Sequence, residues 1–310
     1  MTVEAQHSPR ASIDPATQVG LVSLTVADLE RSVGFYTEAL GFEALEQDGA
    51  VAVLGTATSP LLLLVAHAGA RPWPQGAYSF TGLYHFAILL PTRAGLGRWL
   101  RHWLDLGYPL PGQGDHLVSE ALYLSDPDGN GIEIYRDRPR GEWRWIGGQV
   151  QMATDPVDIR GLLTEAEAAG EPWTGLPEGT RIGHVHLQVG DIAQARDFYH
   201  EILGFDIVAQ MPSALFVSAG GYHHHIGMNT WHSRGASPAP SGTAGLRCFT
   251  LELPSEEARA DVIGRLDGHG IAYTREAGLT IVRDPSQNAI LLQVRTIEDA
   301  GSAVRLAGYR

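Results

Sequence analysis

The sequence predicts an α+β protein in which four strand–helix units are divided between two domains. The main observation is an internal repeat, because residues 20–42 return as residues 183–205 with matching glycines, an aspartate and a Phe-Tyr pair. A weaker repeat links residues 82–91 to residues 245–254. Duplication of one unit is the economical explanation of such self-similarity. At 310 residues, the chain is also long enough for two domains of ordinary size.

The first and third units share one local pattern. Each begins with a strand-like alternation, followed by an aspartate, Asp28 or Asp191, that suits a helix N-cap. Apolar side chains then recur at helical spacing, and a glycine ends the run. These apolar residues are Leu29, Val33, Tyr36 and Leu40 in the first unit and Ile192, Ala195, Tyr199 and Leu203 in the third.

The second and fourth units begin at the weaker repeat and also continue into apolar helical patterns. Their ends match as well, since residues 126–132 and 284–290 share the pattern Asp-Pro-x-x-Asn-x-Ile. We therefore expect an N-terminal domain at residues 17–137, formed by units one and two, and a C-terminal domain at residues 181–296, formed by units three and four. Residues 138–180 are rich in glycine, proline and tryptophan and are predicted to be a linker with one short helix.

Composition excludes several classes of function. The chain has 35 acidic and 22 basic residues and a net charge of -13, so we expect no binding to nucleic acid or to an anionic membrane. The longest apolar run, residues 61–66, is much shorter than the ~20 residues that span a bilayer. No export signal is visible, so a cytoplasmic location is expected. The single cysteine, Cys248, agrees with this because no intrachain disulfide can form.

Polar side chains alternate with apolar ones along the strands that begin unit three and end unit two. Successive side chains of a strand point to opposite faces. His184, His186 and Gln188 therefore share one face of their strand, and Glu133 lies opposite its two neighbouring isoleucines. Tyr123 likewise lies opposite the leucines of its strand.

Two histidines and one carboxylate on inward strand faces form the ligand set that leaves open positions on Fe(II) or Mn(II). A lone histidine on a strand is more often a satisfied structural residue, so the pattern by itself leaves the ligands open. His186 shares a face with His184 and is an alternative ligand.

Taken together, these segments resemble the vicinal oxygen chelate superfamily and, within it, type I extradiol ring-cleavage dioxygenases of the catechol 2,3-dioxygenase group. The resemblance covers roughly residues 17–296 and is carried by residues 82–91, 114–133 and 213–227. It implies that each unit is a βαβββ module and that two modules close into an open barrel around a metal ion.

The resemblance also implies the roles of individual residues. Its metal ligands fall on His85, Glu133 and His184, with Fe(II) as the cofactor and Mn(II) as the alternative. Its proton-handling histidine falls in the run from His223 to His225, where the alignment favours His224. Its remaining catalytic histidine and tyrosine fall on His116 and Tyr123.

One feature departs from the family's pattern, in which the C-terminal domain supplies all ligands. The fourth module has Cys248 and Leu291 where a histidine and an acid are wanted, and the first has Leu21 in place of the histidine. Modules one and four are therefore expected to be scaffold. The active barrel must combine modules two and three, either within one chain or across a subunit boundary.

The implied function is extradiol cleavage of catechol or a substituted catechol by O2, giving a 2-hydroxymuconate semialdehyde, in an enzyme expected to be a homo-oligomer. The rivals are a glyoxalase-type metal-dependent isomerase or lyase and a metal-free ligand-binding protein of the same fold. Isomerase sites of this kind close the metal with a second carboxylate, and residues 222–228 offer none.

Overall fold

The computed structural model describes residues 11–74, 80–276 and 279–295, and it confirms an α+β fold built from four βαβββ modules. Module one comprises β1 (Gln18–Val26), α1 (Leu29–Gly34), the π-helical turn η1 (Phe35–Ala39), β2 (Glu43–Asp48), β3 (Val51–Thr56) and β4 (Ser59–Ala66). Module two comprises β5 (Gly82–Leu89), α2 (Arg93–Asp105), β6 (Gly112–Asp115), β7 (Ser119–Ser125) and β8 (Gly131–Asp137).

The second half of the chain repeats this order. Module three comprises β11 (Arg181–Gln188), α4 (Ile192–Arg196), the π-helical turn η3 (Asp197–Ile202), β12 (Asp206–Met211), β13 (Ala214–Ser218) and β14 (Ile226–Asn229). Module four comprises β15 (Gly245–Leu253), α5 (Glu256–Gly268), β16 (Tyr273–Glu276), β17 (Leu279–Arg283) and β18 (Ala289–Val294). The linker carries η2 (Arg140–Glu142), β9 (Trp145–Ile146), β10 (Gln149–Val150) and α3 (Ile159–Ala169).

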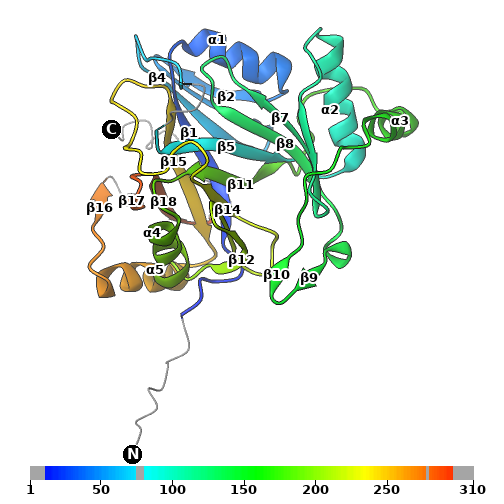
Figure 1. The fold of residues 1–310 in the computed structure, drawn as a ribbon. Coiled ribbons are helices and arrows are strands. Elements are labelled where there is room, and N and C mark those ends of the chain that lie inside the picture. Colours follow the sequence, from blue (N-terminus) through cyan, green and yellow to red (C-terminus); the bar gives the residue numbers. More distant parts are fainter. Residues whose placement is uncertain (1–10, 75–79, 277–278, 296–310) are drawn as a thin grey trace, which may run out of the picture.

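Two eight-stranded sheets hold the modules in pairs (Figure 1). One sheet has the order β16-β17-β18-β15-β1-β4-β3-β2 and combines modules one and four, and the other has the order β12-β13-β14-β11-β5-β8-β7-β6 and combines modules two and three. The antiparallel pairs β1–β15 and β5–β11 join the modules. Each sheet is therefore built across the linker, and modules two and three pair within one chain. The domain boundaries expected from the repeat, residues 17–137 and 181–296, stay a prediction.

The predicted helix ends of modules one and three are present. Asp28 accepts a hydrogen bond from the backbone N–H of Arg31 at 3.0 Å, and Asp191 does the same for Gln194 at 2.9 Å. Such N-caps satisfy amide groups that a helix leaves free at its start. After the helical segment of module one, Gly41 has φ +84°, a left-handed conformation that favours glycine. Within the described residues, no helix is long and apolar enough to cross a membrane.

The inner face of the sheet formed by modules one and four is filled with apolar side chains. Leu21, Cys248 and Leu291 lie in one buried cluster with Val53, Leu63, Ile281 and Ala289. Burial raises the pKa of the Cys248 thiol to about 12, so it is a small core residue and no thiolate forms near neutral pH. This apolar inner face is what a purely structural sheet would have, as expected for modules one and four.

The linker packs closely on module two. Helix α3 lies beside α2 (Figure 1), and a side chain at Gly97 would come within 2.3 Å of the carbonyl oxygen of Leu162. Trp143 is buried among residues of modules two and three, whereas Trp145 is 41% exposed. Packing is therefore the role of Trp143, and the short helix predicted in this segment is confirmed as α3.

A buried carboxylate ties the edge of module two to its helix. Glu120 on β7 is 2% exposed and accepts hydrogen bonds from Arg93 at 2.7 and 3.2 Å and from Arg136 at 2.7 Å. Substitution E120Q should lower the free energy of unfolding by about 3 kcal/mol, because it removes the buried anion that two part-buried guanidinium groups share. Urea denaturation measures this loss.

The control is E165Q, which removes the exposed partner of Arg93 and should cost less than about 1 kcal/mol. Burial alone would raise the pKa of Glu120, but its bonds to Arg93 and Arg136 outweigh this and hold the pKa below its ordinary value. The folded-state pKa is thus the lower one, so the stabilisation exists at neutral pH and is lost as the pH falls through it. The stabilities of wild type and E120Q should converge in acid, and a constant difference down to about pH 3 would contradict this account.

Candidate metal centre and cavity

Three side chains predicted to bind a metal converge on the inner face of the sheet formed by modules two and three. Glu133 Oε2 lies 3.0 Å from His85 Nε2 and 3.2 Å from His184 Nε2. One ligand atom from each residue lies within 4.8 Å of the other two, and all three side chains are buried. Among the described residues, no other group of histidine, cysteine or acidic side chains meets this geometry.

Strand register explains the convergence. Ala87 on β5 pairs with His184 on β11 and with Glu133 on β8, and directly paired residues point to the same face. His85 precedes Ala87 by two residues and therefore shares that face. The small side chain of Ala87 leaves room between the two neighbouring strands. An ordinary sheet pattern thus brings together residues from positions 85, 133 and 184.

The electrostatics of the group suit a divalent cation. Burial alone would raise the pKa of Glu133, but the charges and hydrogen bonds of His184 and His85 outweigh it and hold the pKa well below its usual range. Burial lowers the pKa of His184, against the opposing effect of Glu133. The buried Nδ1 of His184 has no hydrogen-bond partner. Two imidazoles and one carboxylate, whose ligand atoms lie within 4.8 Å of one another in a buried position, fit a metal site of this ligand type.

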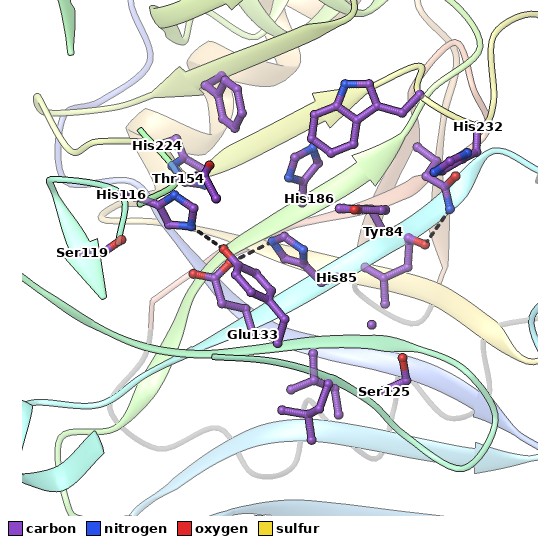
Figure 2. A pocket seen from close by; sticks show the side chains of 18 of the residues that line it. Tyr84, His85, His116, Ser119, Ser125, Glu133, Thr154, His186, His224 and His232 are labelled. Carbon is purple, nitrogen blue, oxygen red and sulfur yellow. Dashed lines mark hydrogen bonds and ion pairs between the residues drawn. The ribbon is translucent and has the colours of Figure 1, made fainter. Parts of the chain in front are cut away.

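A cavity of about 740 Å³ opens over this group. His85 and Glu133 form part of its lining, whereas His184 lies beneath them and is 1% exposed. Figure 2 shows His85, Glu133, His116 and His224 pointing toward the same space. The three residues predicted to be catalytic, His116, Tyr123 and His224, all line this cavity.

His116 and Tyr123 form a hydrogen-bonded pair at one wall. His116 Nδ1 lies 2.7 Å from the carbonyl oxygen of Ala153, which only accepts, so Nδ1 carries the proton. The other nitrogen of the ring, Nε2, then accepts from the Tyr123 hydroxyl at 2.5 Å. Burial and the nearby charge of Glu133 raise the pKa of Tyr123 well above its ordinary value, so it stays a neutral phenol. The linker carbonyl of Ala153 therefore sets the orientation of this pair.

His224 lies against His184, with ring centroids 4.1 Å apart. Burial and the neighbouring imidazoles of His184 and His223 lower the pKa of His224 well below its ordinary value, so the ring is neutral near pH 7. Its neighbours in the run differ, because neither His223 nor His225 lines the cavity. His225 Nδ1 accepts from the backbone N–H of Ala219, and burial lowers its pKa to about 3.

His186 forms a wall of the cavity and is not part of the three-residue group. Its Nε2 accepts a hydrogen bond from the Asn229 amide at 3.0 Å. Burial and the neighbouring histidines lower the pKa of His186 well below its ordinary value. A neutral imidazole held in this way leaves Nδ1 as a donor, which favours His184 over His186 as the ligand.

Sequence reasoning missed the aromatic and apolar walls of the cavity. Tyr84, Trp231 and Phe216 surround the ring of His186, and Met152 comes from the linker. Tyr84 directly precedes the predicted ligand His85, so its place in the sequence could have identified it as a cavity residue. Trp231 and Met152 lie outside the repeated strands, where no pattern identifies them.

Comparisons with known proteins agree with the fold. The family described as Glyoxalase/Bleomycin resistance protein/Dioxygenase superfamily matches residues 18–134 and 181–304. A protein of Bacillus subtilis (strain 168) named catechol-2,3-dioxygenase is 46% identical over 283 residues, which cover 90% of this chain and 98% of that protein.

Two solved structures show the same fold. A putative dioxygenase from Bacillus subtilis subsp. subtilis str. 168 has a TM-score of 0.60 at 15% identity, covering 92% of this chain and 86% of that one. Glyoxalase I from Zea mays has a TM-score of 0.55 at 17% identity, covering 95% and 98%. The chain therefore belongs to the Glyoxalase/Bleomycin resistance protein/Dioxygenase superfamily, in which it is a homologue of the catechol-2,3-dioxygenase of Bacillus subtilis.

Proposed function

We propose that this protein is an Fe(II)-dependent extradiol dioxygenase. It would cleave catechol or a substituted catechol beside the two hydroxyl-bearing carbons and insert both atoms of O2, giving a 2-hydroxymuconate semialdehyde. The observation that carries the proposal is the convergence of His85, His184 and one carboxylate, Glu133, beside a cavity that also contains His224. The 46% identical catechol-2,3-dioxygenase supports it.

His85, Glu133 and His184 would hold the metal. Fe(II), when bound there, supplies the redox chemistry that lets a catechol react with O2, and Mn(II) is the alternative. The group has a single carboxylate among the described residues, whereas a glyoxalase-type isomerase would need a second one to close the site. This ligand set therefore favours the dioxygenase.

The chain's other residues would handle protons and orient the substrate. His224 is neutral and faces the cavity, so it can accept a proton from a catechol hydroxyl and return it later. Tyr123 keeps its proton and donates it to His116, so its hydroxyl oxygen can accept a hydrogen bond from a catechol hydroxyl. We expect a cytoplasmic homo-oligomer.

The decisive experiment is purification without oxygen, measurement of bound iron and manganese, and then addition of catechol and O2. We expect a yellow ring-fission product and one O2 consumed per catechol. A parallel assay with the hemithioacetal of methylglyoxal and glutathione tests the isomerase. Iron-loaded protein that cleaves no catechol, or that turns over only the hemithioacetal, would refute the dioxygenase.

A further inference from the structure

A chain of hydrogen bonds runs from the end of β8 to the cavity and includes two residues with no role assigned above. His223 Nε2 lies 2.8 Å from Asp137 Oδ1, and His223 Nδ1 lies 2.8 Å from His224 Nδ1. His223 is completely buried, and the side chain of Asp137 is 22% exposed. Asp137 is the last residue of β8, the strand that carries Glu133.

We propose that Asp137 and His223 are positioning residues that fix the tautomer of His224, so that its Nε2 faces the substrate without a proton. This inference rests on the proposed function, in which His224 acts as the base. It adds the reason why Nε2 of that ring has a free lone pair for the first proton transfer.

The direction of each hydrogen bond follows from the groups involved. A carboxylate accepts only, so the bond to Asp137 requires a proton on Nε2 of His223. A bond between two imidazole nitrogens needs one donor and one acceptor, and we assign the acceptor to Nδ1 of His223, whose other nitrogen already donates to Asp137. The proton of the next bond then belongs to Nδ1 of His224, and its Nε2 has a free lone pair. Since Nδ1 is occupied, Nε2 is the nitrogen that can meet a substrate in the cavity that His224 lines.

Packing holds His223 in this orientation. The ring of Tyr222 lies 4.2 Å from it, measured between centroids, and Trp143 of the linker lies edge-on at 5.2 Å. Trp143 is itself fixed by a hydrogen bond from Nε1 to the carbonyl oxygen of Arg138. A buried ring between these neighbours cannot exchange its partners for water. Through Trp143, the linker therefore helps to hold His223, and with it the proposed base His224, in place.

The first test reads the tautomer directly. The full-length chain, labelled with 15N-histidine, is loaded with diamagnetic Zn(II) or left metal-free, and two-bond 1H–15N correlations show which ring nitrogens carry protons. H224Q and H223F identify the two rings. We expect the proton of His224 on Nδ1 and that of His223 on Nε2. A proton on Nε2 of His224, or His223 protonated on both nitrogens, would overturn the inference.

The second test uses substitutions and the iron-loaded enzyme. D137A and H223F should lower kcat about 10- to 100-fold with KM changed less than about threefold, since orientation of the base is lost and binding is not. D137N keeps an accepting oxygen and should recover most of kcat. E252A, which removes the part-exposed partner of Arg295 in the other sheet, is the matched control and should match wild type.

The two tests separate this inference from the proposed function. A wild-type kcat in correctly folded D137A and H223F would refute the positioning role. Absence of ring cleavage in wild type, together with the expected tautomer, would refute the dioxygenase and leave the hydrogen-bond chain established. The spectra of wild type decide the tautomer even where a substitution prevents folding.

Discussion

Substitution E133Q should abolish both metal binding and ring cleavage. Glutamine has nearly the same shape as glutamate, but it removes the only carboxylate of the three-residue group and with it the charge that attracts a divalent cation. Changes to groups that merely support ligands cost about 10- to 100-fold in metal affinity or activity, so loss of a ligand should exceed 100-fold. Metal analysis after anaerobic reconstitution and O2 uptake with catechol measure the two effects.

Thermal unfolding is an independent measurement of the loss of metal binding in E133Q. A ligand that binds only the folded state raises its stability, so Fe(II) should raise the Tm of wild type and leave that of E133Q unchanged. The control is L291A, at the position of the other sheet that corresponds to Glu133. Leu291 pairs with Thr250 on β15 as Glu133 pairs with Ala87 on β5.

L291A should lower the free energy of unfolding by about 2–5 kcal/mol, because it leaves a cavity in an apolar cluster. Folded L291A should still bind iron and cleave catechol. Iron bound at wild-type affinity by E133Q would show that the metal lies elsewhere. Loss of iron from folded L291A would show that the sheet of modules one and four takes part in binding.

The repeat made much of the fold predictable. Capping aspartates, helical spacing and terminal glycines are local signals, and they appear in the structure at the expected residues, as with Asp28 and Asp191. Alternation along β11 and β8 also placed His184 and Glu133 on inward faces, because a strand leaves a side chain only two directions. Local pattern was enough to identify the elements and the faces that carry polar groups.

Pairing between the modules was not contained in any local pattern. Residues in β5 and β11 are about a hundred positions apart, and many strand partners would satisfy the same alternation. Only the apolar or thiol side chains at Leu21, Cys248 and Leu291, in place of metal ligands, indicated that modules two and three must combine. The sequence left open whether they do so within one chain, and the register of Ala87 with His184 and Glu133 shows that they do.

The walls of the cavity were harder still to predict. Ala153 orients His116, and Trp143 packs on His223, yet both belong to a linker without periodic sequence. Their role depends on where the linker crosses the sheet, which is decided by packing of whole elements. Likewise, the contact of His223 with Asp137 joins residues from different modules.

The second large effect concerns the charge of the substrate. Catechols with a neutral apolar substituent should be cleaved with a kcat/KM about 100-fold higher than the same ring with a carboxylate. The described residues that line the cavity include no arginine or lysine. A carboxylate would lose its hydration without gaining a partner, at a cost of at least ~2–3 kcal/mol. Steady-state kinetics with 4-methylcatechol and 3,4-dihydroxybenzoate measure the ratio.

A cation placed at the rim should change this preference in a predictable direction. Met211 lines the cavity and is 46% exposed, so M211K can add a positive charge without burying it. M211K should raise kcat/KM for the carboxylated catechol several-fold and leave that for 4-methylcatechol nearly unchanged, and the gain should fall with added salt. M211Q, of similar length and without charge, is the control.

Efficient cleavage of 3,4-dihydroxybenzoate by wild type would contradict this account, because it would require a cation at the carboxylate that the described lining does not supply. An equal response to M211K and M211Q would show that shape rather than charge governs entry. If instead the carboxylated ring binds in wild type but is not cleaved, the apolar walls near Tyr84 and Trp231 hold it in a position that His224 cannot reach. In that case KM for the two catechols would be similar and the difference would lie in kcat, which separates exclusion from misplacement.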